Sequence, residues 1–344
     1  MRADYGADEP YAALGEVAIE GWRRWNAAWP VRRFHETGVA FLCRAPMAPG
    51  GYEHDSYQVL TRRGHPLERL DAAAIARRFP ALGNGVHVDG YWNPMGGWAE
   101  SGAVVAALVA QAIARGVTVR AGVAIGGVVD DGSRVVGATI DHAIVRADLV
   151  LVCAGAWTAA LVPELAGALR ATGQPVFHLA PADPTSFTAD RFPVFGADLA
   201  RTGWYGFPLT DGVVKLANHG VGVALAPDAP AAARVVRDSD ESSLRGFLAA
   251  ALPALADAPI VRTRLCVYGD SADGHFWIAP HPDRPGLAIA AGGSGHAFKF
   301  APVLGDLIAD LVTGGDHPLA ARFRWRPEQR AVRSEEAARF TGLA

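Results

Sequence analysis

Residues 292–302 read Gly292-Gly293-Ser294-Gly295-His296-Ala297-Phe298-Lys299-Phe300-Ala301-Pro302, and the fold is best understood from this segment. The apolar residues 287–291 before it indicate a buried strand, and apolar residues recur at helical spacing after it as far as Val312. Pro302 suits the first turn of that helix, and Gly314 suits its C-terminal end. The pattern therefore predicts a strand, a glycine-rich loop and a helix.

This corner favours a ligand that becomes anionic. Its three glycines allow a backbone to approach a flat ligand closely. The helix N-terminus contributes partial positive charge, and Lys299 contributes a full charge. The alternative is an ordinary strand-to-helix turn with a solvated lysine, and the pattern alone leaves both interpretations open.

Composition narrows the class of protein. The 344 residues suffice for two subdomains, and half are hydrophobic, yet no apolar run is long enough to span a bilayer and the N-terminus has no signal-peptide pattern. The net charge of −3, without a basic block, argues against a nucleic-acid surface. Cys43, Cys153 and Cys266 lie far apart without metal-ligand spacing, so we expect a reducing cytoplasm and no metal site.

Two kinds of strand alternate along the chain. Residues 147–153 and 287–291 are apolar without alternation, which indicates a parallel sheet covered on both faces, with a further short strand at 117–120. Residues 174–261 contain alternating strands, which indicate an antiparallel sheet with one exposed face. Helices are predicted at residues 8–27, 72–79, 100–115 and 244–252.

A dinucleotide-binding turn is missing from the sequence. Such a fold requires a strand, a Gly-x-Gly-x-x-Gly turn and a helix. Residues 83–85 and 220–222 supply the first two glycines of the motif but not the third, and neither segment opens a helix. These residues alone therefore cannot bind a pyrophosphate in the usual way.

Several motifs nevertheless resemble one family of flavoproteins. The most specific is residues 294–302, supported by Leu265-Cys266-Val267-Tyr268, Trp204-Tyr205-Gly206-Phe207-Pro208, Lys215-Leu216-Ala217-Asn218-His219 and Ala154-Gly155-Ala156-Trp157. Over nearly its whole length the sequence resembles the D-amino-acid-oxidase superfamily, in the branch of monomeric sarcosine oxidase and the N-methyl amino acid and pipecolate oxidases. That family has a strand-turn-helix-strand unit before the point that matches Arg2, so the resemblance suggests a truncation or a late start codon.

The resemblance implies an α/β (α+β) fold. An incomplete FAD-binding Rossmann-like domain, lacking its first βαβ unit, would comprise residues 1–27, 99–172 and 262–344. A substrate-binding domain built on an antiparallel sheet would comprise residues 28–98 and 173–261. The cofactor implied is FAD, which accepts a hydride from the C–N carbon of a secondary amino acid and passes electrons to O2, giving an imine and H2O2.

By resemblance, Arg2 and Lys299 hold the substrate carboxylate, one as a bidentate fork and the other as a point charge. Tyr205 and Tyr268 match tyrosines of the substrate pocket. Without the resemblance, Arg2 would be read as a frayed terminal residue, and the tyrosines as core residues with hydrogen-bonded tips.

The implied cofactor residues lie in three segments. Cys266 matches the cysteine that attaches FAD through a thioether, although a lone cysteine in an apolar strand is more commonly structural. The remaining cofactor positions are Gly155, Ala156, Trp157, Gly293, Gly295, His296 and Lys299.

Two further residues match catalytic positions. Lys215 resembles the lysine that assists the reaction of reduced flavin with oxygen, since a positive charge there favours superoxide formation. His219 lies on the same strand face if the strand continues, and matches a histidine that adjusts amine protonation. A solvated lysine and a structural histidine are the ordinary alternatives.

The sequence departs from the family near the substrate. Residues 93–98, Asn-Pro-Met-Gly-Gly-Trp, carry an additional glycine pair and a tryptophan, and His178 differs from the sarcosine-oxidase residue. A larger or cyclic secondary amino acid is therefore as reasonable a substrate as sarcosine. A flavin dehydrogenase with another electron acceptor, and a non-catalytic fragment unable to bind FAD, are the alternatives. We expect small-molecule partners, an amino acid and O2, and a monomer or weak oligomer.

Overall fold

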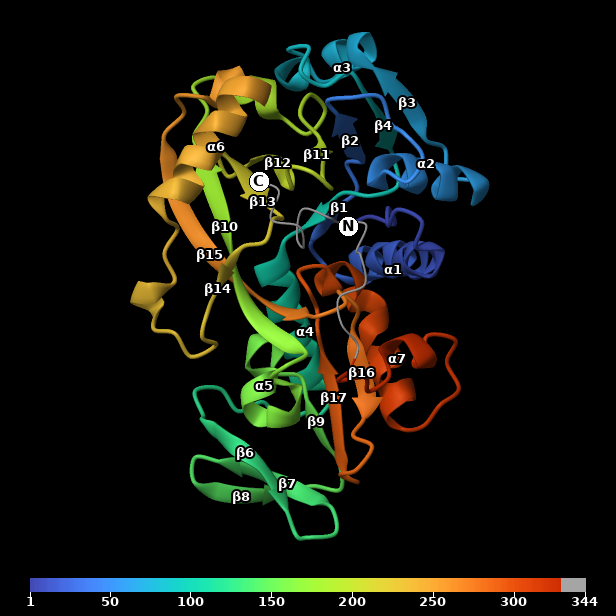
Figure 1. The fold of residues 1–344 in the computed structure, drawn as a ribbon, viewed down its shortest axis with the longest axis vertical. Helices are drawn as coiled ribbons and strands as arrows, with labels where there is room; N and C mark the ends of the chain where they lie inside the picture. The colour runs from blue at the N-terminus through green and yellow to red at the C-terminus, as the bar shows by residue number, and fades with distance from the viewer. Residues whose placement is uncertain (329–344) are drawn as a thin grey trace.

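The computed structural model describes residues 1–328, and the molecule is elongated, with a large sheet at one end and a small meander at the other (Figure 1). Within the described residues, the large sheet has the strand order β14-β10-β13-β12-β11-β2-β4-β3, and β15 also pairs with β10. Its strands are β2 (Val39–Cys43), β3 (Glu68–Asp71), β4 (Asp89–Asn93), β10 (Leu169–Leu179), β11 (Val194–Ala197), β12 (Trp204–Thr210), β13 (Val213–Asn218), β14 (Val223–Ala224) and β15 (Ile260–Ser271).

The neighbours β10, β12 and β13 pair antiparallel, as the alternating pattern predicted. Strand β15, outside that pattern, also pairs antiparallel with β10, and β11 runs parallel to β2. In this register His178 lies opposite both Lys215 on β13 and Arg262 on β15, so these three side chains share one face of the sheet. The pair of β10 and β15 crosses the predicted domain boundaries at 172/173 and 261/262. The predicted FAD-binding and substrate-binding domains would thus share one continuous pair of strands. The division of the chain into these two domains stays a prediction.

A second sheet has the order β16-β17-β9, from β16 (Trp277–Pro280), β17 (Leu287–Ala291) and β9 (Val150–Val152), with β17 parallel to β9. Strand β17 leads through the glycine-rich loop into a short 3-10 turn, η7 (Ala297–Phe300), and then into α7 (Ala301–Val312). Pro302 stands in the first turn of α7, and Gly314 follows its cap with φ +85°. The predicted strand, loop and helix are confirmed.

The other helices surround these sheets. They are α1 (Glu9–Ala28), α2 (Tyr52–Arg62), α3 (Ala72–Arg78), α4 (Ser101–Ala114), α5 (Thr158–Leu161), α6 (Asp238–Ala251) and α8 (Ala320–Phe323). Asp8 caps α1 by accepting a hydrogen bond from the Tyr11 N–H at 3.3 Å. The buried indole of Trp22 on α1 donates to the Lys299 carbonyl at 2.8 Å, which fixes α1 against the corner before α7.

Two smaller sheets complete the described chain. Strands β6 (Ile125–Asp130), β7 (Val135–Ile140) and β8 (Ala143–Arg146) form the meander, and β1 (Phe34–His35) pairs with β5 (Trp98–Ala99). No helix in residues 1–328 has the length and apolar character needed to cross a membrane.

The predicted strand at residues 117–120 is wrong. These residues have no regular secondary structure and pair with none of the strands in residues 1–328. The nearby strand β9 is also shorter than predicted, and Leu149 and Leu151 are exposed rather than covered on both faces. Helix α4 buries Val104 fully and Leu108 partly, whereas its large apolar side chains Val105, Val109 and Ile113 face solvent. Helix α2 was not predicted.

A buried histidine makes the fold sensitive to acid. His87 is 1% exposed, and neither ring nitrogen has a hydrogen-bond partner among the described residues. Burial, assisted by Arg44, lowers its pKa from 6.5 to about 4. Because the folded state disfavours the protonated ring, stability is complete above pH 6.5 and falls as the pH drops towards 4. We expect His87 to remove about 2 kcal/mol of unfolding free energy between pH 7 and pH 5.

Urea unfolding of the wild type and of His87→Leu at both pH values tests this expectation. The variant should lose less stability on acidification, whereas His142→Asn at an exposed position should follow the wild type. Equal losses in the wild type and in His87→Leu would contradict it.

Candidate active site

The predicted site residues meet at one cavity of about 810 Å³, between a face of the large sheet and the corner that precedes α7. The residues of the predicted site that line it are Arg2, Tyr205, Lys215, His219, Cys266, Tyr268, Gly295, His296 and Lys299. They come from five separate segments of the chain. The fold therefore brings together most of the residues that the motifs singled out.

The glycine-rich loop is shaped by its contacts with the end of β15. Gly292 and Gly295 have φ of +68° and +73°, and a Cβ at Gly295 would lie 2.2 Å from the Tyr268 ring. Only glycine allows both this conformation and this approach. The Ser294 N–H donates to the Gly269 carbonyl at 3.1 Å, and Ser294 Oγ accepts from the Ser271 N–H at 3.1 Å.

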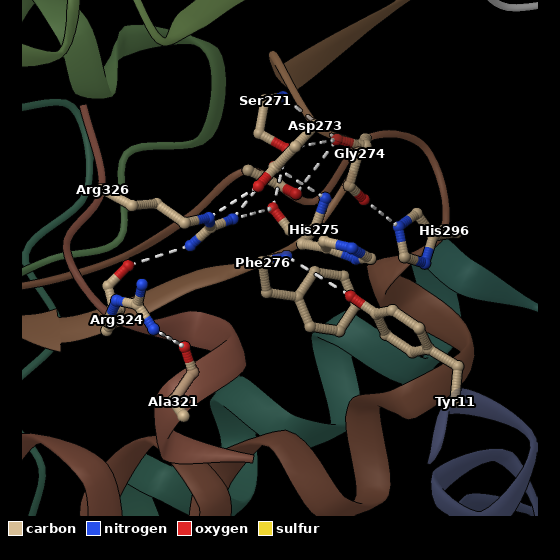
Figure 2. A network of polar contacts seen from close by, with 12 residues as sticks. Tyr11, Ser271, Asp273, Gly274, His275, Phe276, His296, Ala321, Arg324 and Arg326 are labelled. Carbon is tan, nitrogen blue, oxygen red and sulfur yellow. Dashed lines mark hydrogen bonds and ion pairs between the residues drawn. The ribbon is translucent and has the colours of Figure 1, made fainter. Parts of the chain in front are cut away.

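His296 is fixed from both ring nitrogens. Its Nε2 lies 2.9 Å from the Gly274 carbonyl oxygen (Figure 2). Its Nδ1 lies 2.9 Å from the Tyr5 hydroxyl. Since a carbonyl only accepts, Nε2 carries the proton and Nδ1 accepts from Tyr5. The turn that holds Gly274 is in turn anchored by a buried ion pair, Asp273 with Arg326, at 2.6 and 3.0 Å (Figure 2).

Two cations stand at the corner side of the cavity. Lys299 Nζ lies 4.6 Å from the centroid of the Tyr5 ring. The Arg2 guanidinium lies within 5.6 Å of the rings of Tyr5, Phe41 and Tyr52, and donates to the Tyr52 hydroxyl and the Asp4 carbonyl. Arg2 is thus held among aromatic rings rather than frayed, and both Arg2 and Lys299 line the cavity.

The additional glycine pair found in the sequence explains how Arg2 reaches this place. Met1 and Gly97 exchange backbone hydrogen bonds, and a Cβ at Gly96 would lie 2.8 Å from the Met1 carbonyl oxygen. The pair therefore serves close packing of the N-terminal strand, and next to it Trp98 lines the cavity. Trp98 stacks on His35 with centroids 4.2 Å apart, and His35 Nε2 lies 2.7 Å from the Glu100 carboxylate.

Lys215 projects from β13 on the sheet side of the cavity. Its Nζ lies 4.8 Å from the centroid of the Phe207 ring. Burial lowers the pKa of Lys215, and the positive charges of Arg264 and Arg262 lower it further, against the opposing influence of Cys266. The sequence contains only two lysines among its 32 lysines and arginines, Lys215 and Lys299, and both line this cavity.

The aromatic and thiol groups predicted for the site share the sheet wall. The His219 ring lies between those of Tyr205 and Tyr268, with centroids 6.5 and 6.3 Å away. Cys266 is half-buried and forms no disulfide among the described residues. His178, singled out as a departure from the family, also lines the cavity, and its pKa is lowered by burial and then by Arg262 and Lys215.

Four predicted cofactor residues do not line the cavity. Gly155, Ala156 and Trp157 form a 3-10 turn, η2, that packs against β15, where a Cβ at Gly269 would lie 2.9 Å from Gly155. Gly293 lies on the far side of the loop from the cavity lining. A cofactor role for these residues stays a prediction, as do the roles of the residues that the fold does bring together.

An apolar wall was missed from the sequence. It is lined by Val39, Phe41, Val194, Phe195, Leu199 and Phe207. These residues lie on or next to β2, β11 and β12. The alternating pattern predicted the strand at β12 but gave no sign of which of its faces would border a cavity, and β11 was not predicted. Only the pairing of β11 with β2 brings the two halves of this wall together.

Comparisons with known proteins agree with this arrangement. The family described as FAD dependent oxidoreductase, DAO, matches residues 2–311. Monomeric sarcosine oxidase of Bacillus sp. (strain B-0618) is 27% identical, over 92% of this chain and 80% of that protein. N-methyl-L-tryptophan oxidase of Citrobacter koseri is 30% identical, over 91% of this chain and 82% of that protein.

Solved structures show the same fold. A thermally stable mutant of fructosyl peptide oxidase superposes with a TM-score of 0.81 at 23% identity, covering 96% of this chain and 82% of that one. L-proline dehydrogenase from P. horikoshii superposes with a TM-score of 0.81 at 18% identity, covering 94% and 84%. The family match over nearly the whole described chain confirms the resemblance carried by the motifs, and with it FAD as the cofactor. The chain belongs to the DAO family of FAD-dependent oxidoreductases.

Proposed function

We propose that this protein oxidises the C–N bond of a secondary amino acid to an imine and passes the electrons to O2, giving H2O2. The observation that carries the proposal is the convergence of Arg2, Lys299, Lys215 and Cys266 on one cavity. Relatives named monomeric sarcosine oxidase and N-methyl-L-tryptophan oxidase support an N-methyl amino acid as substrate.

The cavity fits the ring system of FAD. Gly295 and His296 of the glycine-rich loop line the cavity, and the loop and Lys299 place positive charge beside it. The chemistry that FAD supplies when bound is acceptance of a hydride from the substrate and its transfer to oxygen. The sequence contains no Gly-x-Gly-x-x-Gly turn for the pyrophosphate, so the proposal concerns the ring end of the site.

The chain's own residues would orient the substrate. Arg2 and Lys299 bind its carboxylate, the first through a fork of two donors and the second as a point charge. His219, which is 8% exposed, lies between Tyr205 and Tyr268, and this desolvated group of polar side chains favours the neutral amine. A neutral nitrogen lone pair is what hydride loss from the adjacent carbon requires.

The apolar wall points to a bulky substrate. Phe207 of this wall and the neighbouring lining residue Trp98 are only partly buried, and they offer aromatic surface that sarcosine, with its single methyl group, would leave uncovered. We therefore place N-methyl-L-tryptophan and similar N-methyl amino acids ahead of sarcosine. A screen of secondary amino acids with the FAD-loaded protein, coupled to H2O2 detection, tests this order. Turnover of no secondary amino acid would reject the function.

A dehydrogenase with another electron acceptor is the second candidate. The formation of H2O2 distinguishes the dehydrogenase from the oxidase. A dehydrogenase would oxidise the same amino acid with a dye as electron acceptor, and in air it would form no H2O2. The buried positive charge of Lys215 favours the oxidase, because it stabilises the anion that forms when oxygen takes an electron.

Cys266 gives a prediction about cofactor attachment. Its sulfur borders the cavity, so a thioether to the flavin would keep the yellow colour in the protein after acid precipitation. In Cys266→Ser, the flavin should appear in the supernatant. Cys153→Ser, at an exposed cysteine away from the cavity, should retain it. Free flavin from the wild type would contradict attachment while leaving the oxidase function open.

Two broader expectations belong to the same proposal. Three free cysteines favour a reducing cytoplasm. A monomer or weak oligomer is expected in solution, and light scattering of the purified protein at several concentrations measures it.

A further inference from the structure

One aromatic ring contacts both cations of the corner. The Tyr5 ring centroid lies 4.6 Å from Lys299 Nζ and 5.6 Å from Arg2 Cζ. Arg2 also lies over the rings of Phe41 and Tyr52. Among the described contacts, Tyr5 is the ring that lies close to both Arg2 and Lys299. The positive charges of Arg2 and Lys299 repel each other. A ring that contacts both side chains can therefore influence the positions that the two cations adopt.

The Tyr5 ring is itself firmly fixed. It is 8% exposed, stacks on Tyr11 with centroids 5.0 Å apart, and contacts Phe300 at 5.6 Å. Its hydroxyl donates to His296 Nδ1 at 2.9 Å, and His296 donates in turn to Gly274 (Figure 2). The orientation of this ring is therefore set by the same loop that carries Lys299.

The electrostatics of the ring explain what such a contact does. The face of an aromatic ring is negative, so it attracts both cations and offsets part of their repulsion without neutralising either charge. The ring thus helps to keep both cations beside the cavity that they line.

We propose that Tyr5 is a positioning residue, whose ring holds Arg2 and Lys299 in the arrangement that receives an anionic group of the substrate. The inference rests on the proposed function in taking that group to be the amino acid carboxylate. The contact between Tyr5 and Lys299 can be measured without enzyme turnover. A failure of the positioning role can therefore be distinguished from a failure of the proposed oxidase function.

Kinetics of the flavin-loaded enzyme give the first test. We expect Tyr5→Leu to raise KM for N-methyl-L-tryptophan about tenfold while leaving kcat within about a factor of two. Tyr5→Phe keeps the ring and should raise KM much less. N-methyltryptamine, which lacks the carboxylate, should show no change in KM with either variant.

Tyr11→Leu is the matched control. Tyr11 packs against Tyr5 in the same core, yet its described cation contact is with Arg322 rather than with Arg2 or Lys299. Loss of packing should lower its stability without raising KM. An equal rise in KM for Tyr11→Leu and Tyr5→Leu would mean that Tyr5 acts only by packing, and would overturn the proposal.

Nuclear magnetic resonance gives a test that needs no activity. Because the chain has only two lysines, protein labelled with 13C-lysine shows one ε-CH2 signal from Lys299 and one from Lys215. The ring current of Tyr5 should displace the Lys299 signal, and Tyr5→Leu should return it towards its ordinary position. Tyr5→Phe should keep the displacement. An undisplaced Lys299 signal in the wild type would reject the contact, whatever the enzyme oxidises.

Fluorinated phenylalanines at position 5 keep the proposal testable if Tyr5→Leu does not fold. Each added fluorine weakens the negative face while the ring keeps nearly the same shape. KM for N-methyl-L-tryptophan should then rise stepwise from Phe through difluoro- to trifluoro-phenylalanine, with no trend for N-methyltryptamine. A flat series would show that the ring face does not act on the cations.

Discussion

Replacing Lys299 with Met is expected to raise KM for N-methyl-L-tryptophan roughly 50-fold, the value for losing a charge-assisted hydrogen bond to a bound carboxylate. The methionine side chain has similar length and keeps the packing against Tyr5, so the change removes the charge and little else. Steady-state kinetics of the flavin-loaded variant, with H2O2 detection, measure the effect.

Two comparisons separate this role from a general disturbance. N-methyltryptamine has no carboxylate, so its KM should be the same in Lys299→Met and in the wild type. Lys299→Arg retains the charge and should recover part of the lost affinity, although its planar fork cannot occupy the same position as an ammonium. An unchanged KM for the amino acid would remove Lys299 from the substrate site.

The part of the site that could be predicted from the sequence is the part encoded locally. The glycine spacing, Pro302 and the helical period after it define the corner before α7 without reference to the rest of the chain. The alternation of residues 174–261 likewise gave the antiparallel sheet that carries Lys215. The motifs then supplied the family, and through it the roles proposed for these residues.

The rest depends on pairings between distant segments. The apolar wall forms because β11 lies parallel to β2, about 150 residues earlier in the chain, and periodicity carries no information on such a partner. The failure at residues 117–120 has the same origin, since an apolar run becomes a strand only where a neighbouring edge exists. Gly96 and Gly97 were noticed in the sequence, but their purpose became clear only from the approach of Met1.

The use of lysine in this chain links the two sides of the cavity. Arginine occupies all but two of the 32 basic positions, and both lysines line the cavity, as Arg2 and Arg262 also do. An arginine could neither lose its proton nor act as a compact charge at these two positions. We infer that these two positions require an ammonium group, a requirement that substitution of each lysine by arginine can measure.

Lys215→Met is expected to slow the reaction of the reduced enzyme with O2 by about 100-fold, the usual effect of removing one preorganised charge from a reacting centre. Reduction by the amino acid under anaerobic conditions should stay within about threefold of the wild type, because the proposed function assigns the carboxylate to Arg2 and Lys299 and not to Lys215. Stopped-flow absorbance separates the two half-reactions. Equal slowing of both would assign Lys215 to substrate binding, and slowing of neither would exclude it from the chemistry.

The pH dependence of the oxygen half-reaction is a second test of the role of the Lys215 ammonium group. Burial lowers the pKa of Lys215, so its ammonium loses the proton at a lower pH than an exposed lysine would. The rate of reoxidation should therefore be high at neutral pH and fall as the pH rises through that lowered pKa. In Lys215→Arg the side chain remains charged throughout, so the decline should vanish even if the absolute rate is reduced. A decline that persists in Lys215→Arg would belong to another group, and the buried ammonium would then not be what favours oxygen.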